Sequence, residues 1–200
     1  MEASHADQGT PAHSGHDHHP MPTEGSALTG VAISATLHCL TGCAIGEVSG
    51  MAIGTAAGMS NGATIALSIA LAFLFGYGLT SLPLLRAGFA VAAVIPIALA
   101  SDTLSIATME VVDNLIMVTI PGAMDAGLGN VLFWGSLSFA LAVAFVFAVP
   151  VNRYLIGRGK GHAAVHETGV HGGPPVRLVG AVTVLAAIFG TAVLLAEALG

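Results

Sequence analysis

Charged residues are scarce in this chain of 200 residues. It has only five Lys and Arg and eleven Asp and Glu, 8% of its residues, whereas a soluble domain carries roughly 25%. Five scattered basic residues cannot neutralise a phosphate backbone, so a nucleic-acid binder is excluded. Two cysteines are too few for a disulfide-stapled secreted domain. The chain also lacks a glycine-rich phosphate loop with Lys, which excludes ATP-driven transport by this chain alone.

Apolar residues are abundant and occur in long runs. They make up 54% of the chain, which excludes a disordered protein. The runs do not alternate with polar residues, so a transmembrane β-barrel is rejected. The pattern predicts an all-α, polytopic transmembrane helical bundle whose partner is the lipid bilayer. Five spans are predicted, at about 29–57, 63–85, 88–118, 127–150 and 177–197.

The basic residues predict the orientation of this bundle. With five spans and the N-terminus inside, Arg86, Arg153, Arg158, Lys160 and Arg177 all fall on the cytoplasmic side. Segment 102–121 complicates the count, because it carries acids and ends at a Pro-Gly pair. It is either part of one long tilted helix or a separate re-entrant segment.

Two hydrophilic stretches, one before the first span and one between the fourth and fifth spans, contain most of the histidines. Residues 1–26 are interpreted as a disordered tail, and 158–176 as a flexible Gly/His-rich loop. A transmembrane core of four spans lies between them at 27–157, and the fifth helix occupies 177–200. The tail histidines predicted to capture metal ions are His13, His16, His18 and His19.

A ladder of glycines runs along the first span at a spacing of four residues. Residues four apart share one helix face, and glycines there allow a neighbouring helix to approach until the backbones touch. The ladder therefore predicts close helix packing, against another span or against a second copy of the chain in a homo-oligomer. It comprises Gly42, Gly46, Gly50, Gly54 and Gly58.

A second stripe beside the ladder carries sulfur and a carboxylate. Cys39, Cys43, Glu47 and Met51 repeat every four residues, and His38 is adjacent. Thiolate and thioether ligands select monovalent copper or zinc. Residues four apart lie about 5–6 Å apart at Cβ, too far for an unstrained disulfide, which needs about 3.5–4.5 Å. The alternative is that the cysteines are small core residues and that the carboxylate reaches an interface.

The third span contains a group of acids. Asp102, Glu110 and Asp113 lie within twelve residues, with Asn114 beside them. A carboxylate at the bilayer centre costs at least about 2.5–3.5 kcal/mol, so the group predicts a proton or cation relay. The alternative is a helix end exposed to water, where acids are harmless.

Three motifs carry a resemblance to a known family. They are His38–Glu47, Met109–Asn114 and Pro121–Asp125. On these motifs, over roughly residues 30–160, the chain resembles a bacterial membrane family catalogued as domain of unknown function four-three-nine-six. The resemblance implies a multi-pass protein of the bacterial plasma (inner) membrane, and it supplies no catalytic residue.

The residues leave three functions open. The first is a permease or metal-handling protein, with copper favoured, in which the acids exchange protons. The second is a membrane enzyme that uses a bound metal or the thiol pair for redox chemistry. The third is a non-catalytic scaffold or accessory subunit assembled through the glycine ladder. The sequence favours a role without catalysis and identifies no catalytic residue.

Overall fold

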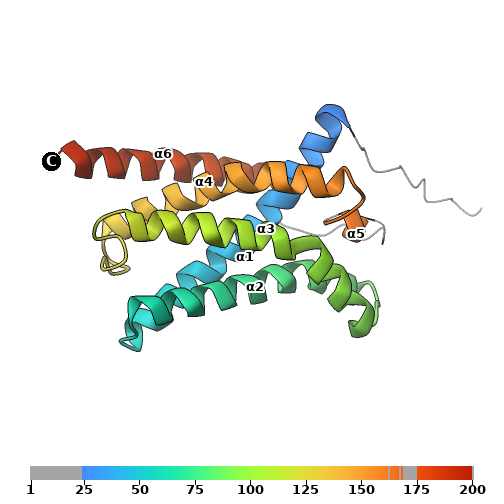
Figure 1. The fold of residues 1–200 in the computed structure, drawn as a ribbon, viewed down its shortest axis with the longest axis horizontal. Coiled ribbons are helices and arrows are strands. Elements are labelled where there is room, and N and C mark those ends of the chain that lie inside the picture. Colours follow the sequence, from blue (N-terminus) through green and yellow to red (C-terminus); the bar gives the residue numbers. More distant parts are fainter. Residues whose placement is uncertain (1–23, 162, 167, 169–174, 200) are drawn as a thin grey trace, which may run out of the picture.

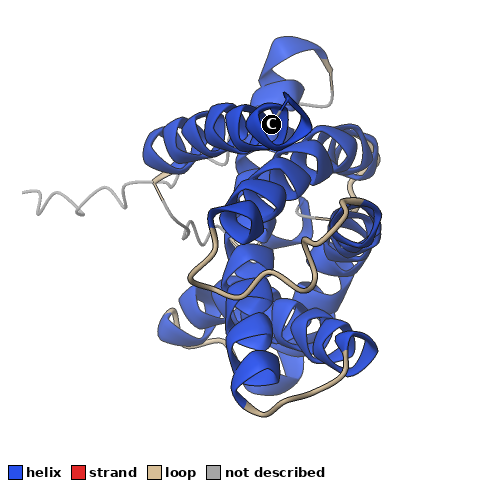
Figure 2. Cartoon of the chain, turned by 90° about the vertical axis from the view of Figure 1, so that its left-hand side faces the viewer, coloured by secondary structure: helices blue, strands red, loops and turns tan. Residues whose placement is uncertain are grey.

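The computed structural model describes residues 24–161, 163–166, 168 and 175–199, and these form helices joined by short turns, with no strand (Figures 1 and 2). The tail histidines predicted to capture metal lie outside the described residues. The helices are α1 (Gly25–Ala56), α2 (Asn61–Arg86), α3 (Val91–Thr119), α4 (Val131–Ile156), α5 (Ala163–His166) and α6 (Val176–Leu199).

Five of these helices, all except α5, are long and apolar enough to cross a membrane. The predicted all-α, multi-pass bundle is therefore confirmed, and each span begins and ends within a few residues of its predicted bounds, apart from the later end of α4. The third span is one continuous helix with Pro96 inside it, not a short helix followed by a re-entrant one. Its first turns run at an angle to the rest (Figure 1), as expected where proline interrupts helix hydrogen bonding.

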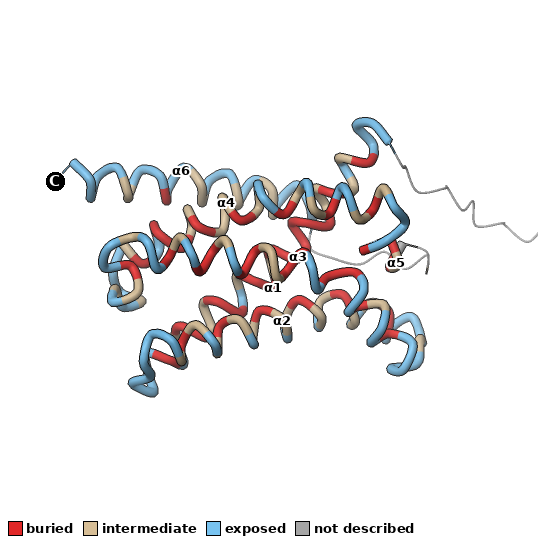
Figure 3. The backbone as a smooth tube through the Cα atoms, in the orientation of Figure 1, coloured by how far each residue is buried: buried red, intermediate tan, exposed pale blue. Residues whose placement is uncertain are grey.

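Helix α1 lies at the centre of the bundle. In its most apolar stretch 56% of the residues are buried, against 11% in α6 (Figure 3). Its 32 residues extend about 48 Å, well beyond the roughly 30 Å hydrocarbon core of a bilayer. In Figure 1 it crosses diagonally behind the other helices, so that it contacts α2, α3, α4 and α6.

Four glycines of α1 face α2 of the same chain. A Cβ added at Gly42 would lie 2.6 Å from the Gly76 Cα, and one added at Gly46 would collide with the backbone of Ala72. Further along α1, Gly50 and Gly54 meet small hydroxyl residues of α2, Ser68 and Thr64. Two backbones that approach this closely gain dispersion contacts that lipid cannot replace. A second copy of the chain could reach this face only by displacing α2.

Gly58 does not share this packing, contrary to the sequence-based expectation. It lies beyond the end of α1, where its φ is +62° and an added Cβ would meet nothing within 4 Å. Its role is to reverse the chain after the helix, a left-handed conformation that glycine adopts without strain.

The described part of the segment after α4 contains a further helical turn, which the sequence did not predict. This turn, α5, packs on α3. Its apolar side chains, Ala163 and Val165, are buried. The remaining long helix, α6, packs on α4, where Gly190 fits against the Gly135 carbonyl and the Phe139 backbone.

The contact between α1 and α2 predicts the effect of a bulky side chain at Gly46. We expect Gly46→Leu to lower the free energy of unfolding by about 1–3 kcal/mol or more, because the side chain has no space beside Ala72. Denaturant titration of the purified protein, followed by circular dichroism, measures this change.

The matched control is Gly30→Leu in the same helix, where an added Cβ meets nothing within 4 Å. Equal stabilities of the two variants would contradict the close packing of α1 against α2.

Candidate functional site

The two cysteines of α1 contact acids of α3. Cys39 Sγ donates a hydrogen bond to Asp102 Oδ1 at 3.7 Å, and the Cys43 side chain interacts electrostatically with the Glu110 carboxyl group. Both cysteines are free thiols and are 1% exposed. The two stripes that the sequence separates by more than sixty residues therefore meet along one helix interface.

A pair of carboxyl groups continues this interface one turn further along α1. The side chains of Glu47 and Asp113 interact with each other, and they are 3% and 2% exposed. Two neighbouring carboxylates repel each other, so a proton on one of them or a cation beside them stabilises the pair. Glu47 Oε2 and Asp113 Oδ1 have no hydrogen-bond partner and can accept a further proton or a cation.

These contacts form a single feature, which we name the acid–thiol column. It consists of Cys39, Cys43 and Glu47 on α1 and Asp102, Glu110 and Asp113 on α3. Asn114 extends it, because its Nδ2 donates to the Glu110 carbonyl oxygen at 3.0 Å and to Glu110 Oε2 at 3.4 Å. All seven residues are buried.

A hydrogen-bonded amide connects the column to α4. Asn152 Nδ2 donates to Thr36 Oγ1 at 2.8 Å and to Ser105 Oγ at 2.9 Å, and Ser105 in turn interacts with the Cys39 thiol. The sequence reasoning missed these three residues. Asn152 follows Pro150, where span four was expected to end, but α4 continues to Ile156. The signal that could have identified Asn152 is its amide side chain near the end of an otherwise apolar run.

The remaining residues of the predicted metal set lie elsewhere. His38 Nε2 is 3.1 Å from Thr80 Oγ1 on α2, whereas the cysteines contact α3. Met51 belongs to an apolar cluster with Met117 and Phe133. The thioether grouped with the two cysteines is that of Met109 on α3, which is fully buried.

The residues predicted to form one metal centre are therefore divided between different helix interfaces. In the described part of the chain, no three His, Cys, Asp or Glu side chains converge closely enough to hold a metal ion. The donors are arranged as successive pairs: Cys39 with Asp102, Cys43 with Glu110, and Glu47 with Asp113. Helical geometry explains this, since donors four apart on α1 advance about 6 Å per step.

Comparison with known proteins identifies a family but no relative of known activity. No curated protein and no solved structure is significantly similar to the chain. A family model matches residues 30–161, which include α2, α3, α4, nearly all of α1 and every residue of the acid–thiol column. The chain therefore belongs to the family described as Domain of unknown function (DUF4396).

Proposed function

We propose that this multi-pass membrane protein binds a cation in the acid–thiol column and moves it across the membrane in exchange for protons. The observation that carries the proposal is the burial of Glu47, Glu110 and Asp113, while all five basic side chains are exposed. A buried carboxylate without a cationic neighbour is costly in a bilayer. Protons or a bound cation therefore have to neutralise these acids.

The thiols favour a soft transition metal as the cargo, with copper first and zinc second. Each cysteine has an acid beside it, and the Met109 thioether lies in the same cluster. Sulfur donors select monovalent copper or zinc over hard cations. A pair of donors holds an ion less tightly than a closed set, which suits an ion that has to leave again.

Proton exchange follows from the contact between Glu47 and Asp113. A proton shared by the two carboxyl groups is no longer needed once a cation lies between them, because the cation supplies the positive charge. Binding of one monovalent cation with release of one proton leaves the net charge of the buried pair unchanged. An exchange of this kind avoids placing an unpaired charge in the bilayer.

The proposal includes a bacterial plasma membrane and a cytoplasmic N-terminus. Arg86 ends α2, Arg153 lies in the last turn of α4, and Arg177 lies in the first turn of α6. If all five long helices cross the membrane, these basic residues lie on one side, which the positive-inside rule makes cytoplasmic.

The thiols provide the first test. In vesicles containing the purified protein, we expect Cys39→Ser combined with Cys43→Ser to reduce uptake of monovalent copper by about tenfold or more, because hard oxygen replaces soft sulfur. A copper-sensitive dye inside the vesicles measures the uptake.

The control is to add Ser138→Cys to the double variant. Ser138 lies in a groove between α1, α4 and α6, so a thiol there should not restore uptake. Undiminished copper content and uptake in the double variant would refute the role of the column in copper movement.

The carboxyl pair provides the second test. We expect Glu47→Gln to abolish the change of internal pH that accompanies copper uptake, because an amide cannot release the exchanged proton. The free energy of unfolding should not fall, since the amide can still donate a hydrogen bond to Asp113. A pH-sensitive dye and a denaturant titration measure the two quantities.

Glu197→Gln is the matched control, because Glu197 is exposed on α6 and lies outside the column. A Glu47→Gln variant that still couples copper uptake to a pH change would show that Glu47 does not carry the exchanged proton.

A further inference from the structure

A groove with a volume of about 520 Å³ lies where the start of α1 meets the end of α4. The two helix ends lie at the same end of the bundle (Figure 1), and Leu28 and Ile156 pack in one buried cluster between them. The groove is open to the outside, because most of its lining residues are exposed. These residues are Glu24, Gly25, Leu28, Pro150, Arg153 and Tyr154.

Two opposite charges line this groove without neutralising each other. Among the described residues, no ion pair joins Glu24 to Arg153, and the Glu24 side chain does not cap α1. Arg153 Nε donates to Thr29 Oγ1 at 3.1 Å, while the Thr29 hydroxyl donates to the Gly25 carbonyl oxygen at 3.2 Å. The guanidinium group is therefore held through Nε, and its two terminal amino groups are left to bind an anion.

An apolar strip leads from the groove along the outside of α4. Phe147, Pro150 and Tyr154 are three and four residues apart, so they share one helix face. Phe147 is 55% exposed and Tyr154 is 58% exposed. Tyrosines near the ends of membrane spans lie at the level of the lipid headgroups. A lipid whose headgroup occupies the groove can therefore place a hydrocarbon chain along Phe147.

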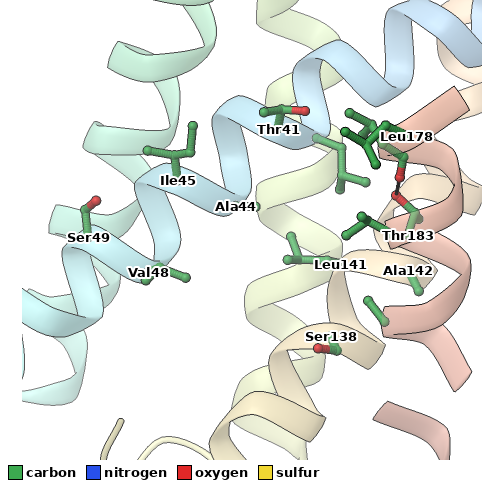
Figure 4. Close-up of a pocket in the computed structure, with 14 residues that line it drawn as sticks. Thr41, Ala44, Ile45, Val48, Ser49, Ser138, Leu141, Ala142, Leu178 and Thr183 are labelled. Atoms are coloured by element: carbon green, nitrogen blue, oxygen red, sulfur yellow. Dashed lines mark hydrogen bonds between the residues drawn. The ribbon is translucent and has the colours of Figure 1, made fainter. Parts of the chain in front are cut away.

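A second groove in the bundle lacks this combination of charges. It has a volume of about 570 Å³, lies between α1, α4 and α6, and is lined mainly by apolar side chains (Figure 4). Its polar groups are hydroxyls such as those of Thr41 and Ser138, and none of its lining residues is charged. It can hold a hydrocarbon chain but cannot select a headgroup by its charge.

We propose that the groove between α1 and α4 binds the zwitterionic headgroup of an aminophospholipid, phosphatidylethanolamine being the simplest. The phosphate binds the terminal amino groups of Arg153, whose planar fork matches two phosphate oxygens. The ammonium group, which has three donors, binds the Glu24 carboxylate. An anionic headgroup without an amine would place a like charge beside Glu24. A choline headgroup carries the same charges but has no N–H to donate.

This binding site is separate from the proposed cation exchange. None of its residues belongs to the acid–thiol column, and it concerns the lipid that surrounds the bundle. The proposal can be tested in the absence of copper, so a failure of the transport experiments does not decide it.

The experiment places a single tryptophan beside the groove. The only native tryptophan is Trp134, in the first turn of α4 and far from Arg153 in its last turn. The full-length variant Trp134→Phe with Phe147→Trp is placed in phosphatidylcholine vesicles that contain increasing amounts of a lipid brominated in its chains. Bromine quenches tryptophan fluorescence on contact. We expect brominated phosphatidylethanolamine to bind about fivefold more tightly than brominated phosphatidylcholine, which corresponds to about 1 kcal/mol, the strength of one exposed ion pair.

Four further variants of this protein identify the groups responsible. Glu24→Gln should lower the binding of phosphatidylethanolamine to the level of phosphatidylcholine. Arg153→Gln should weaken the binding of both lipids relative to a brominated diacylglycerol, which has no phosphate. The matched controls are Glu197→Gln and Arg86→Gln, because these two residues are also exposed but lie on α6 and α2. Both controls should keep the preference for phosphatidylethanolamine.

Equal binding of the two brominated lipids before any change at Glu24 would overturn the proposal. A preference for phosphatidylethanolamine that persists in Glu24→Gln would also overturn it. Tighter binding of brominated phosphatidylglycerol than of phosphatidylethanolamine would count against it too. That result would show that the other basic residues at this end decide the binding, such as Arg158, whose Cζ lies 4.3 Å from the centre of the Tyr154 ring.

Discussion

The structure depends on holding acids together where no basic side chain neutralises them. Glu47, Glu110 and Asp113 lie between α1 and α3, and like charges in a region of low dielectric repel each other strongly. The contact between these two helices therefore cannot rest on the acids themselves. Other contacts have to hold α1 against α3, and a positive charge or protons have to compensate the acids.

The helices on either side of α1 provide those contacts. On one side, the glycines of α1 bring its backbone against α2. On the other, Ala140, Ala144 and Ala148 of α4 are completely buried at four-residue spacing, and the last two pack against the cluster that contains the cysteines. Asn152 then connects α4 to both α1 and α3 through hydrogen bonds. Small residues thus stabilise the bundle at the places where the acids destabilise it, as is common around functional sites.

The difference between the pattern along one helix and the packing between helices explains which features could be predicted from the sequence. Periodicity along one helix predicts which residues share a face, so the sulfur stripe and the acid group were both recognisable. The partners of each face could not be predicted, because the register between α1 and α3 depends on how α2 and α4 pack around them. His38 illustrates the difficulty, since it neighbours Cys39 in sequence but contacts Thr80 on another helix. Asn152, Thr36 and Ser105 were missed because uncharged polar residues in an apolar run have no periodic signal.

Helix α6 takes no part in the acid–thiol column. It lies outside the matched family region, it is the least buried of the long helices, and it packs mainly on α4 through Gly190 and Gly135. It contributes no residue to the acid–thiol column, and the groove that it borders has no charged lining residue. A groove that has an acid, Glu110, among its lining residues lies instead between α2 and α3, within the family region. The buried acids and thiols are therefore concentrated in α1 and α3, and α6 extends the apolar surface of a bundle whose polar interior is already complete without it.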